Sequence, residues 1–292
     1  MAKAAEKSEE KSVALATAKG MTASVPDFLK GYDGATGTEG IESTDVSIPR
    51  LKLGQGLTPE VKDKLVNDGD MFHSITKEVI VPRGEAGRFI PIAYTKEWIL
   101  WNDILNGGGI FDRAQKTLVN GEVKYRWLNP NQEYKNKVKG VVAVTWRTKE
   151  FIEEDGLGKF GSSIPGDKES PPAATEHFNY IVCLPDFGYQ LVALSFSRTA
   201  AKKARDLNAM LKMSNTPMFA RVFKISAVPD QNDSGQEYYN YGIIPDGFVQ
   251  TEEEFTLMRN LFEEFSKKSF QVDFSEEAAA DSKTEAERQE GF

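Results

Sequence analysis

Cysteine is almost absent from this sequence: Cys183 stands alone, so the chain cannot form an internal disulfide. A single thiol inside the apolar run 177–184 fits a reducing compartment and a buried core position. No run approaches the ~20 apolar residues that a membrane-spanning helix needs, and residues 1–30 lack the continuous apolar stretch of a secretory signal. We therefore expect a cytoplasmic protein with no membrane partner.

Residues that usually carry catalysis are equally scarce. The two histidines, His73 and His177, do not form a metal-binding spacing, and no nucleophile elbow, phosphate-binding loop or Cys-x-x-Cys motif is present. The glycine run 107–109 lacks the strand–glycine–helix context of a dinucleotide site. Asp230 opens a stretch that imitates a calcium loop, but Tyr241 stands where such a loop needs a bidentate glutamate. We expect no cofactor and no enzymatic activity.

The net charge of −8 argues against nucleic acid at first sight, but the charge is uneven along the chain. Residues 271–292 hold seven acidic and two basic residues, and residues 1–40 hold six acidic and five basic residues. The segment between them is therefore close to neutral. It can hold a basic stripe that the overall charge conceals.

Composition divides the chain into a body and two termini. Residues 1–42 are rich in small and charged residues without a sustained hydrophobic period, which predicts a disordered N-terminal arm. Residues 271–292 predict a flexible acidic C-terminal tail for the same reason. The folded domain should span 43–270. It should contain a long insertion at about 102–175, part of which is a loop rich in Gly, Ser and Pro.

Most of the body has the residue pattern of β-strands. Alternating or β-branched runs predict strands at 46–53, 71–81, 88–101, 138–151, 177–184, 189–196, 218–228 and 236–244, and a hairpin at 117–128. Asn120-Gly121 predicts a two-residue hairpin turn. Helical spacing predicts a short helical turn at 59–66, a helix at 198–213 and a last helix at 252–268 with a capping box at Thr251 and Glu254.

This order predicts a mainly β fold of the β-rich α+β class. It fits an OB-like barrel, in which a helix lies between strands 3 and 4 and the face of strands 2 and 3 binds oligonucleotides. The long insertion and the C-terminal helix would be additions to that barrel. Other α+β folds share the same order of elements.

One stretch combines cations with aromatic rings. A protein that binds single strands needs cations for phosphates and exposed rings on which bases stack, at about 1–3 kcal/mol per base. Residues 124–139 hold one acid, Glu133, among five cations that we expect to contact phosphates: Lys124, Arg126, Lys135, Lys137 and Lys139. Three rings are expected to stack on bases, namely Tyr125, Trp127 and Tyr134. Each ring could face the core instead.

Smaller groups of the same kind extend this candidate DNA-binding surface. They are Tyr94, Lys96 and Trp98 on one strand face, Arg50 and Lys52 on an outer strand face, Trp146, Arg147 and Lys149, Arg198 and Lys202 on a basic helix, and Tyr239 in the last hairpin. The alternative for the tryptophans is a core position. The alternative for the basic helix is an ordinary solvated face.

The expected tail is acidic and ends in an aromatic residue, and we expect Glu285, Glu287, Glu290, Gly291 and Phe292 to bind partner proteins. An anionic segment can occupy the protein's own basic groove until DNA, with its higher charge density, displaces it. The terminal ring and carboxylate could then bind an apolar pocket with a basic rim on a partner. The alternative is a tail that only raises solubility.

These features together resemble the single-stranded-DNA-binding proteins of bacterial and bacteriophage replication. Segments 217–225 and 232–240 are similar to the region around strands 4 and 5 of phage members. The resemblance implies a protein that coats single-stranded DNA without strong sequence preference and protects it in phage-type replication or recombination. Its tail would tune DNA binding and recruit replication or recombination proteins, and homo-oligomers are compatible with this. The chain lacks the proline that precedes the last phenylalanine in bacterial members.

Two other functions stay open. A phage structural or interaction protein without a nucleic-acid site would use the basic and aromatic stretches as ordinary strands. A Mg²⁺-dependent nuclease would use the acidic run Glu150, Glu153, Glu154 and Asp155, because paired carboxylates are common ligands of catalytic metal ions. A solvated loop is the alternative for that run.

Overall fold

The computed structural model describes residues 48–102, 109–138, 141–147, 149–163, 167–231, 235–266, 272 and 274, with the backbone alone at 135–138 and 141–147. This part of the chain is mainly β, with antiparallel sheets and a C-terminal helix. It divides into two compact units. Of the described residues, those up to Phe89, Cys183–Val192 and Lys224–Gly242 belong to the first unit, and those in Ile90–Val182, in Ala193–Phe223 and from Ile243 onward belong to the second.

The first unit contains a small antiparallel sheet of β1 (Leu51–Leu53), β2 (Met71–His73) and β3 (Val79–Val81), with α2 (Pro59–Lys62) between β1 and β2. The prediction of one strand over 71–81 is therefore wrong. Nδ1 of His73 accepts hydrogen bonds from the backbone N–H groups of Ile75 and Thr76, at 3.2 and 3.1 Å. Lys77 takes a positive φ of 59°. These local features turn the chain back into a hairpin.

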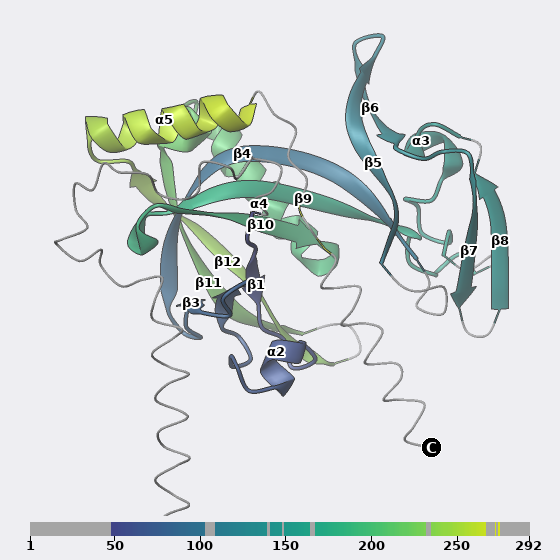
Figure 1. The fold of residues 1–292 in the computed structure, drawn as a ribbon, viewed down its shortest axis with the longest axis horizontal. Coiled ribbons are helices and arrows are strands. Elements are labelled where there is room, and N and C mark those ends of the chain that lie inside the picture. The colour runs from purple at the N-terminus through teal and green to yellow at the C-terminus, as the bar shows by residue number, and fades with distance from the viewer. Residues whose placement is uncertain are drawn as a thin grey trace, which may run out of the picture. The chain divides into compact units, whose positions relative to one another are not determined.

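The largest sheet has seven strands in the order β10-β9-β4-β11-β12, with β5 paired to β4 and β6 paired to β5 (Figure 1). The strands are β4 (Ala86–Trp101), β5 (Ile110–Val119), β6 (Glu122–Trp127), β9 (Ala174–Leu184), β10 (Gln190–Ser197), β11 (Arg221–Gln231) and β12 (Glu237–Phe248). Among the described strands no pairing closes this sheet. The predicted OB-like barrel therefore stays a prediction.

Part of the expected insertion belongs to this sheet. Strand β5 pairs antiparallel with β4, from Glu97 opposite Gln115 to Trp101 opposite Ile110. The following strands β7 (Gln132–Val138) and β8 (Val141–Arg147) form a separate antiparallel hairpin, and α3 (Ile152–Asp155) comes next. Asn120 and Gly121 have φ of 52° and 82°. These left-handed conformations confirm the predicted two-residue turn between β5 and β6.

The remaining helices are η4 (Pro185–Phe187), η5 (Arg198–Ala200), α4 (Ala201–Met213), η6 (Met218–Ala220) and α5 (Glu252–Ser266). The helices predicted at 198–213 and 252–268 correspond to η5 with α4 and to α5. The predicted strand 218–228 is wrong at its start, because η6 occupies its first three residues. Thr251 caps α5, since its Oγ1 accepts the N–H of Glu254 at 3.1 Å. The carboxylate of Glu254 reaches the N–H of Gln250 at 3.0 Å, one residue before the partner that a capping box uses.

The core of the second unit beside the β5–β6 hairpin is a cluster of seven buried residues: Leu100, Ala114, Trp127, Tyr134, Ile152, Leu157 and Ala174. They come from β4, β5, β6, β7, α3, the loop after α3 and β9, so this cluster joins the predicted insertion to the main sheet. Cys183 is buried, as its apolar surroundings predict.

Candidate nucleic-acid interface

Strand β4 presents three of the predicted residues on one face. Tyr94 is 39% exposed, and the side chains of Lys96 and Trp98 are half-buried. The neighbouring positions Ala93 and Glu97 are buried on the other face. The prediction that Tyr94, Lys96 and Trp98 share a face is confirmed, because successive residues of a strand alternate between its two sides.

The ammonium group of Lys96 lies among aromatic rings from three strands. Its Nζ is 5.7 Å from the ring centroid of Trp98, 5.0 Å from that of Tyr125 on β6 and 5.5 Å from that of Phe178 on β9. Cations within about 6 Å of a ring are attracted by its quadrupole. Glu176, also on β9, forms an ion pair with the same ammonium group.

Glu176 also binds a cation on helix α4. Nη2 of Arg205 lies 2.6 Å from Oε2 of Glu176, and the guanidinium carbon lies 5.4 Å from the Phe178 ring. The side chain of Arg205 is 60% exposed, whereas that of Glu176 is 15% exposed. We call the six residues that meet here, above the buried Phe178, the Lys96 patch: Tyr94, Lys96, Trp98, Tyr125, Glu176 and Arg205.

The two tyrosines of the Lys96 patch stay neutral at physiological pH. Burial raises the pKa of Tyr125 to about 12, with further increases from Tyr94, Glu176 and Glu153. Burial also raises the pKa of Tyr94, against an opposing hydrogen bond with Asn208. Both residues can therefore offer a ring for stacking and an O–H group for hydrogen bonding.

The family of the chain fits a phage origin. A model of the Pam3 phage gp34-like protein family matches residues 17–271. The chain belongs to this family. No curated protein and no solved structure matches it. None of the helices in the described ranges is long and apolar enough to cross a membrane.

Two rings of this gp34-like chain that were expected to stack on bases are core residues. Trp127 is 2% exposed and Tyr134 is 5% exposed. Nε1 of Trp127 donates to Oδ2 of Asp155 at 2.6 Å, and the hydroxyl of Tyr134 donates to the backbone oxygen of Trp101 at 3.1 Å. The expectation that these rings are available to DNA is corrected, because both complete the buried cluster beside the hairpin.

The cations next to these rings lie on the opposite face of β6. The side chains of Lys124 and Arg126 approach the Phe151 ring, with 5.0 Å and 5.2 Å to its centroid. Lys124 faces Glu154 at 4.0 Å and Arg126 faces Glu150 at 3.6 Å. Exposed ion pairs of this kind contribute only about 0–1 kcal/mol, so phosphate can replace the carboxylates at little cost.

The acidic run proposed for a nuclease is divided among separate partners. Glu150 and Glu154 face the cations of β6, Glu153 accepts the N–H of Tyr125 at 3.2 Å, and Asp155 accepts from Trp127 and from the N–H of Leu157 at 2.9 Å. Within the described ranges no group of three or more potential metal ligands converges. The carboxylates thus support the hairpin and its surroundings.

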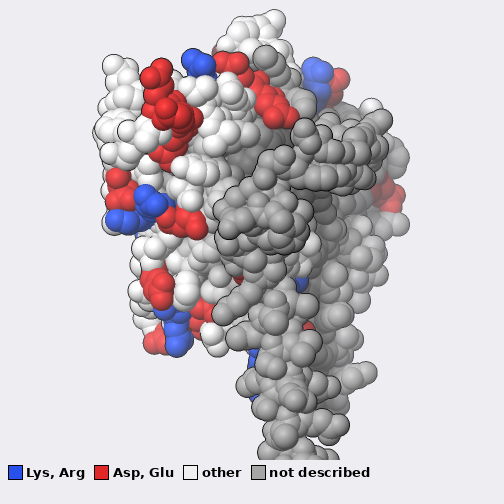
Figure 2. Space-filling model, turned by 60° about the vertical axis from the view of Figure 1, so that its left-hand side comes forward, with Lys and Arg blue, Asp and Glu red and all other residues white. Residues whose placement is uncertain are grey.

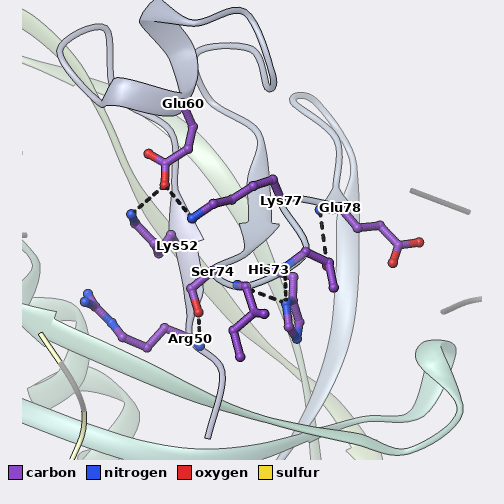
Figure 3. Close-up of polar contacts among 9 residues, drawn as sticks. Arg50, Lys52, Glu60, His73, Ser74, Lys77 and Glu78 are labelled. Atoms are coloured by element: carbon purple, nitrogen blue, oxygen red, sulfur yellow. Dashed lines mark hydrogen bonds and ion pairs between the residues drawn. The ribbon is translucent and has the colours of Figure 1, made fainter. Parts of the chain in front are cut away.

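Lys52 lies in a polar cluster of the first unit, away from the outer face that its alternation predicted. Its ammonium group donates to Oε1 of Glu60 at 2.9 Å, and Lys77 donates to the same oxygen at 3.0 Å (Figure 3). The side chain of Lys52 is 11% exposed. Burial raises the pKa of Glu60, but hydrogen bonds from Lys52, from its own backbone N–H and from Lys77, together with the charge of Lys52, leave the pKa below its usual value. We correct the expectation for Lys52 on this ground.

The other predicted positions have varied surroundings. Arg198, Lys202 and Lys149 are exposed. Arg50 is half-buried, and its backbone N–H donates to Oγ of Ser74 at 2.8 Å (Figure 3). Tyr239 is half-buried, and its backbone is held by the side-chain amide of Gln55 at 3.0 and 2.6 Å. Outside the described side chains lie Lys135, Lys137, Lys139, Trp146, Arg147, Glu285, Glu287, Glu290, Gly291 and Phe292.

Sequence reasoning missed Glu176 and Phe178, which organise the Lys96 patch. Both lie on β9, and only the pairing of β9 with β4 brings them to Lys96. On the face shown in Figure 2, acidic and basic side chains are interspersed. Charges of both signs also lie together in the Lys96 patch, since Lys96 and Arg205 both pair with the carboxylate of Glu176.

Proposed function

We propose that this phage protein binds single-stranded DNA through the Lys96 patch, without strong sequence preference and without enzymatic activity. One observation carries the proposal: Lys96 and Arg205 share the single carboxylate of Glu176 beside the rings of Tyr94 and Tyr125. Within the six residues of the patch two cations face one carboxylate, and rings lie within reach of the same cations. This combination suits a phosphate backbone with stacked bases.

The proposal includes the wider features expected from the sequence. The sheet would be an elaborated relative of the OB-like barrel, and the acidic tail would compete with DNA and recruit replication or recombination proteins. The protein would act in the cytoplasm of the infected cell. Binding that protects single strands needs affinity without base-specific hydrogen bonds, and ring stacking meets this need because every base has a flat face.

The first test is to titrate the whole protein with oligo-dT and to monitor binding by tryptophan fluorescence, with Trp98 as the reporter inside the patch. Replacing Tyr94 by Ala should weaken binding by about 1–3 kcal/mol, the usual value of one stacked base. Replacing both Lys96 and Arg205 by Ala should also reduce the salt dependence, by about 0.7 in log–log slope for each phosphate that the variant no longer neutralises.

The matched control is Lys62→Ala, which removes an exposed cation at the end of α2, outside the patch. Its affinity and salt slope should equal those of the wild-type protein. An absence of oligo-dT binding, or equal losses in the control and the patch variants, would contradict the proposal and favour a structural or interaction protein. Cleavage of the oligonucleotide that depends on Mg²⁺ would instead favour the nuclease alternative.

The tail is tested by deleting residues 275–292. If this segment competes with DNA for the basic surface, its loss should tighten oligo-dT binding most strongly at low salt, where electrostatic attraction is least screened. Unchanged or weaker binding would show that the segment does not imitate DNA.

A further inference from the structure

Two helices of the second unit, α4 and α5, carry opposite charge. Helix α4 holds four basic residues and one acidic residue, whereas α5 holds five acidic residues and one basic residue (Figure 1). Complementary charge on two protein surfaces steers them together and sets their orientation. The basic α4 and the acidic α5 are therefore candidates for the two sides of one contact.

Three of these charged side chains are available for such a contact. Lys212 on α4 and Glu252 and Glu253 on α5 are exposed, and none of them forms an ion pair in the part of the chain that the structure describes. In contrast, Arg205 of α4 already pairs with Glu176. Lys212, Glu252 and Glu253 can thus pair with a second molecule without giving up ion pairs of their own.

Helix α4 ends in an exposed apolar side chain next to Lys212. Met213, its last residue, is 77% exposed. The backbone around it is held in place, because Oγ of Ser214 donates to the backbone oxygen of Leu211 at 2.7 Å and Asn215 ends the helix with a left-handed φ of 49°. Met213 is therefore an adaptable apolar side chain on a well-defined helix end, and methionine is frequent at binding surfaces.

The exposed side of α5 offers a matching surface. Glu252, Glu253, Thr256, Leu257 and Asn260 line a shallow hollow on this helix. Leu257 is 41% exposed, and Glu253 precedes it by one turn on the same side of the helix. Protein interfaces combine an apolar centre with a polar rim. An apolar residue with acidic neighbours therefore suits an apolar residue with a basic neighbour.

We propose that the end of α4 in one copy of this chain binds α5 in a second copy. Met213 packs on Leu257 of the second copy. Lys212 lies beside Glu252 and Glu253 of that copy, where opposite charges attract. Each copy carries both surfaces, so copies can associate without another protein. Nucleic acid is a poor occupant of the hollow, because its phosphates would meet the two carboxylates.

Sedimentation velocity of the whole protein in the absence of DNA tests this contact. The wild-type protein should associate more as its concentration rises, and less at high salt, where attraction between exposed charges is screened. The variants Lys212→Glu and Glu253→Lys should each remain monomeric, because each places like charges on the two sides of the contact. A mixture of the two variants should associate again, because each variant keeps the surface that the other has lost.

The matched controls are Lys116→Glu and Glu122→Lys, which make the same charge changes at exposed positions of the β5–β6 hairpin. Both should associate as the wild-type protein does. Met213→Ser should reduce association at low and at high salt, because it removes the apolar part of the contact. Thermal unfolding checks that every variant is folded, as expected for exposed positions.

Several results would overturn the proposal. They are a wild-type protein that stays monomeric at all concentrations, a mixture that associates no more than its components, equal losses in the two hairpin controls, and unchanged association of Met213→Ser. None of these results bears on DNA binding, which the oligo-dT titration measures separately. Conversely, a protein that associates as proposed but does not bind oligo-dT would reject the proposed function alone.

Discussion

Nε1 of Trp127 donates a hydrogen bond to Oδ2 of Asp155 over 2.6 Å. The bond joins the β6 strand to the short helix α3, and it ties a ring expected to stack on DNA to a carboxylate considered for a metal site. Both residues therefore stabilise the core beside the β5–β6 hairpin.

Replacing Trp127 by Phe should lower the free energy of unfolding by about 1–3 kcal/mol, because the change removes the donor of a buried hydrogen bond. Urea denaturation measures this loss. Oligo-dT affinity should stay at the wild-type level once folding is complete. The comparison variant is Trp98→Phe, at the half-buried position in the Lys96 patch. Loss of affinity in Trp127→Phe without loss of stability would contradict the core assignment.

Replacing Glu176 by Gln should strengthen oligo-dT binding. The change removes the carboxylate that Lys96 and Arg205 share, so both cations can contact phosphates more fully. Partly exposed ion pairs contribute about 0–1 kcal/mol, so the gain should be at most about fivefold. Fluorescence titration measures the gain, and thermal unfolding checks that the fold is retained. Weaker binding would show that Glu176 is needed to position the two cations.

Phe274 should anchor the C-terminal segment to the second unit. Its ring centroid lies 4.8 Å from that of His177 and 6.3 Å from that of Trp101, and Nη2 of Arg113 donates to the backbone oxygen of Val272 at 2.8 Å. Val272 and Phe274 are 2% and 1% exposed, so packed residues lie inside the expected tail, 271–292.

A chain that ends after Phe274 should therefore keep its stability, whereas Phe274→Ala should cost about 3–5 kcal/mol, because the substitution removes the ring and leaves a cavity. Chemical denaturation of both variants measures the difference. Equal stability of Phe274→Ala and the wild-type protein would mean that this ring does not hold the segment in solution.

Because of His73, the free energy of unfolding should decrease as the pH falls below the ordinary pKa of histidine. Burial lowers the pKa of His73, with Glu78 opposing and Lys77 adding to the decrease. As pH falls below the unfolded value of 6.5, the unfolded chain takes up a proton that the folded chain resists, so stability decreases. One such group gives at most about 1.4 kcal/mol per pH unit.

The variant His73→Asn keeps a side-chain acceptor for the turn and does not titrate, so its stability should fall less steeply with acid. Denaturation at a series of pH values compares the two proteins. Parallel curves for variant and wild type would rule out His73 as the cause of the acid sensitivity.

Local sequence signals predicted local structure well. Asn120-Gly121 marked the hairpin turn, because only a few residues tolerate a positive φ. Thr251 marked the start of α5, because its side-chain oxygen accepts an N–H that the helix leaves without a partner. The turn after His73 was missed, since it depends on the orientation of one imidazole ring rather than on a Gly or Pro.

By itself the sequence determined a mainly β chain, the positions of most strands and helices, and the shared face of Tyr94, Lys96 and Trp98. Only the tertiary structure decided which rings are buried. Tyr125 and Trp127 lie on the same side of β6, yet Trp127 belongs to the buried core cluster, whereas Tyr125 packs against its edge and stays half-buried. Likewise, the pairing of β9 with β4 brings Glu176 to Lys96 across 80 positions of sequence. Alternation along a strand sets the side to which a residue points, whereas what lies on that side depends on packing between distant segments.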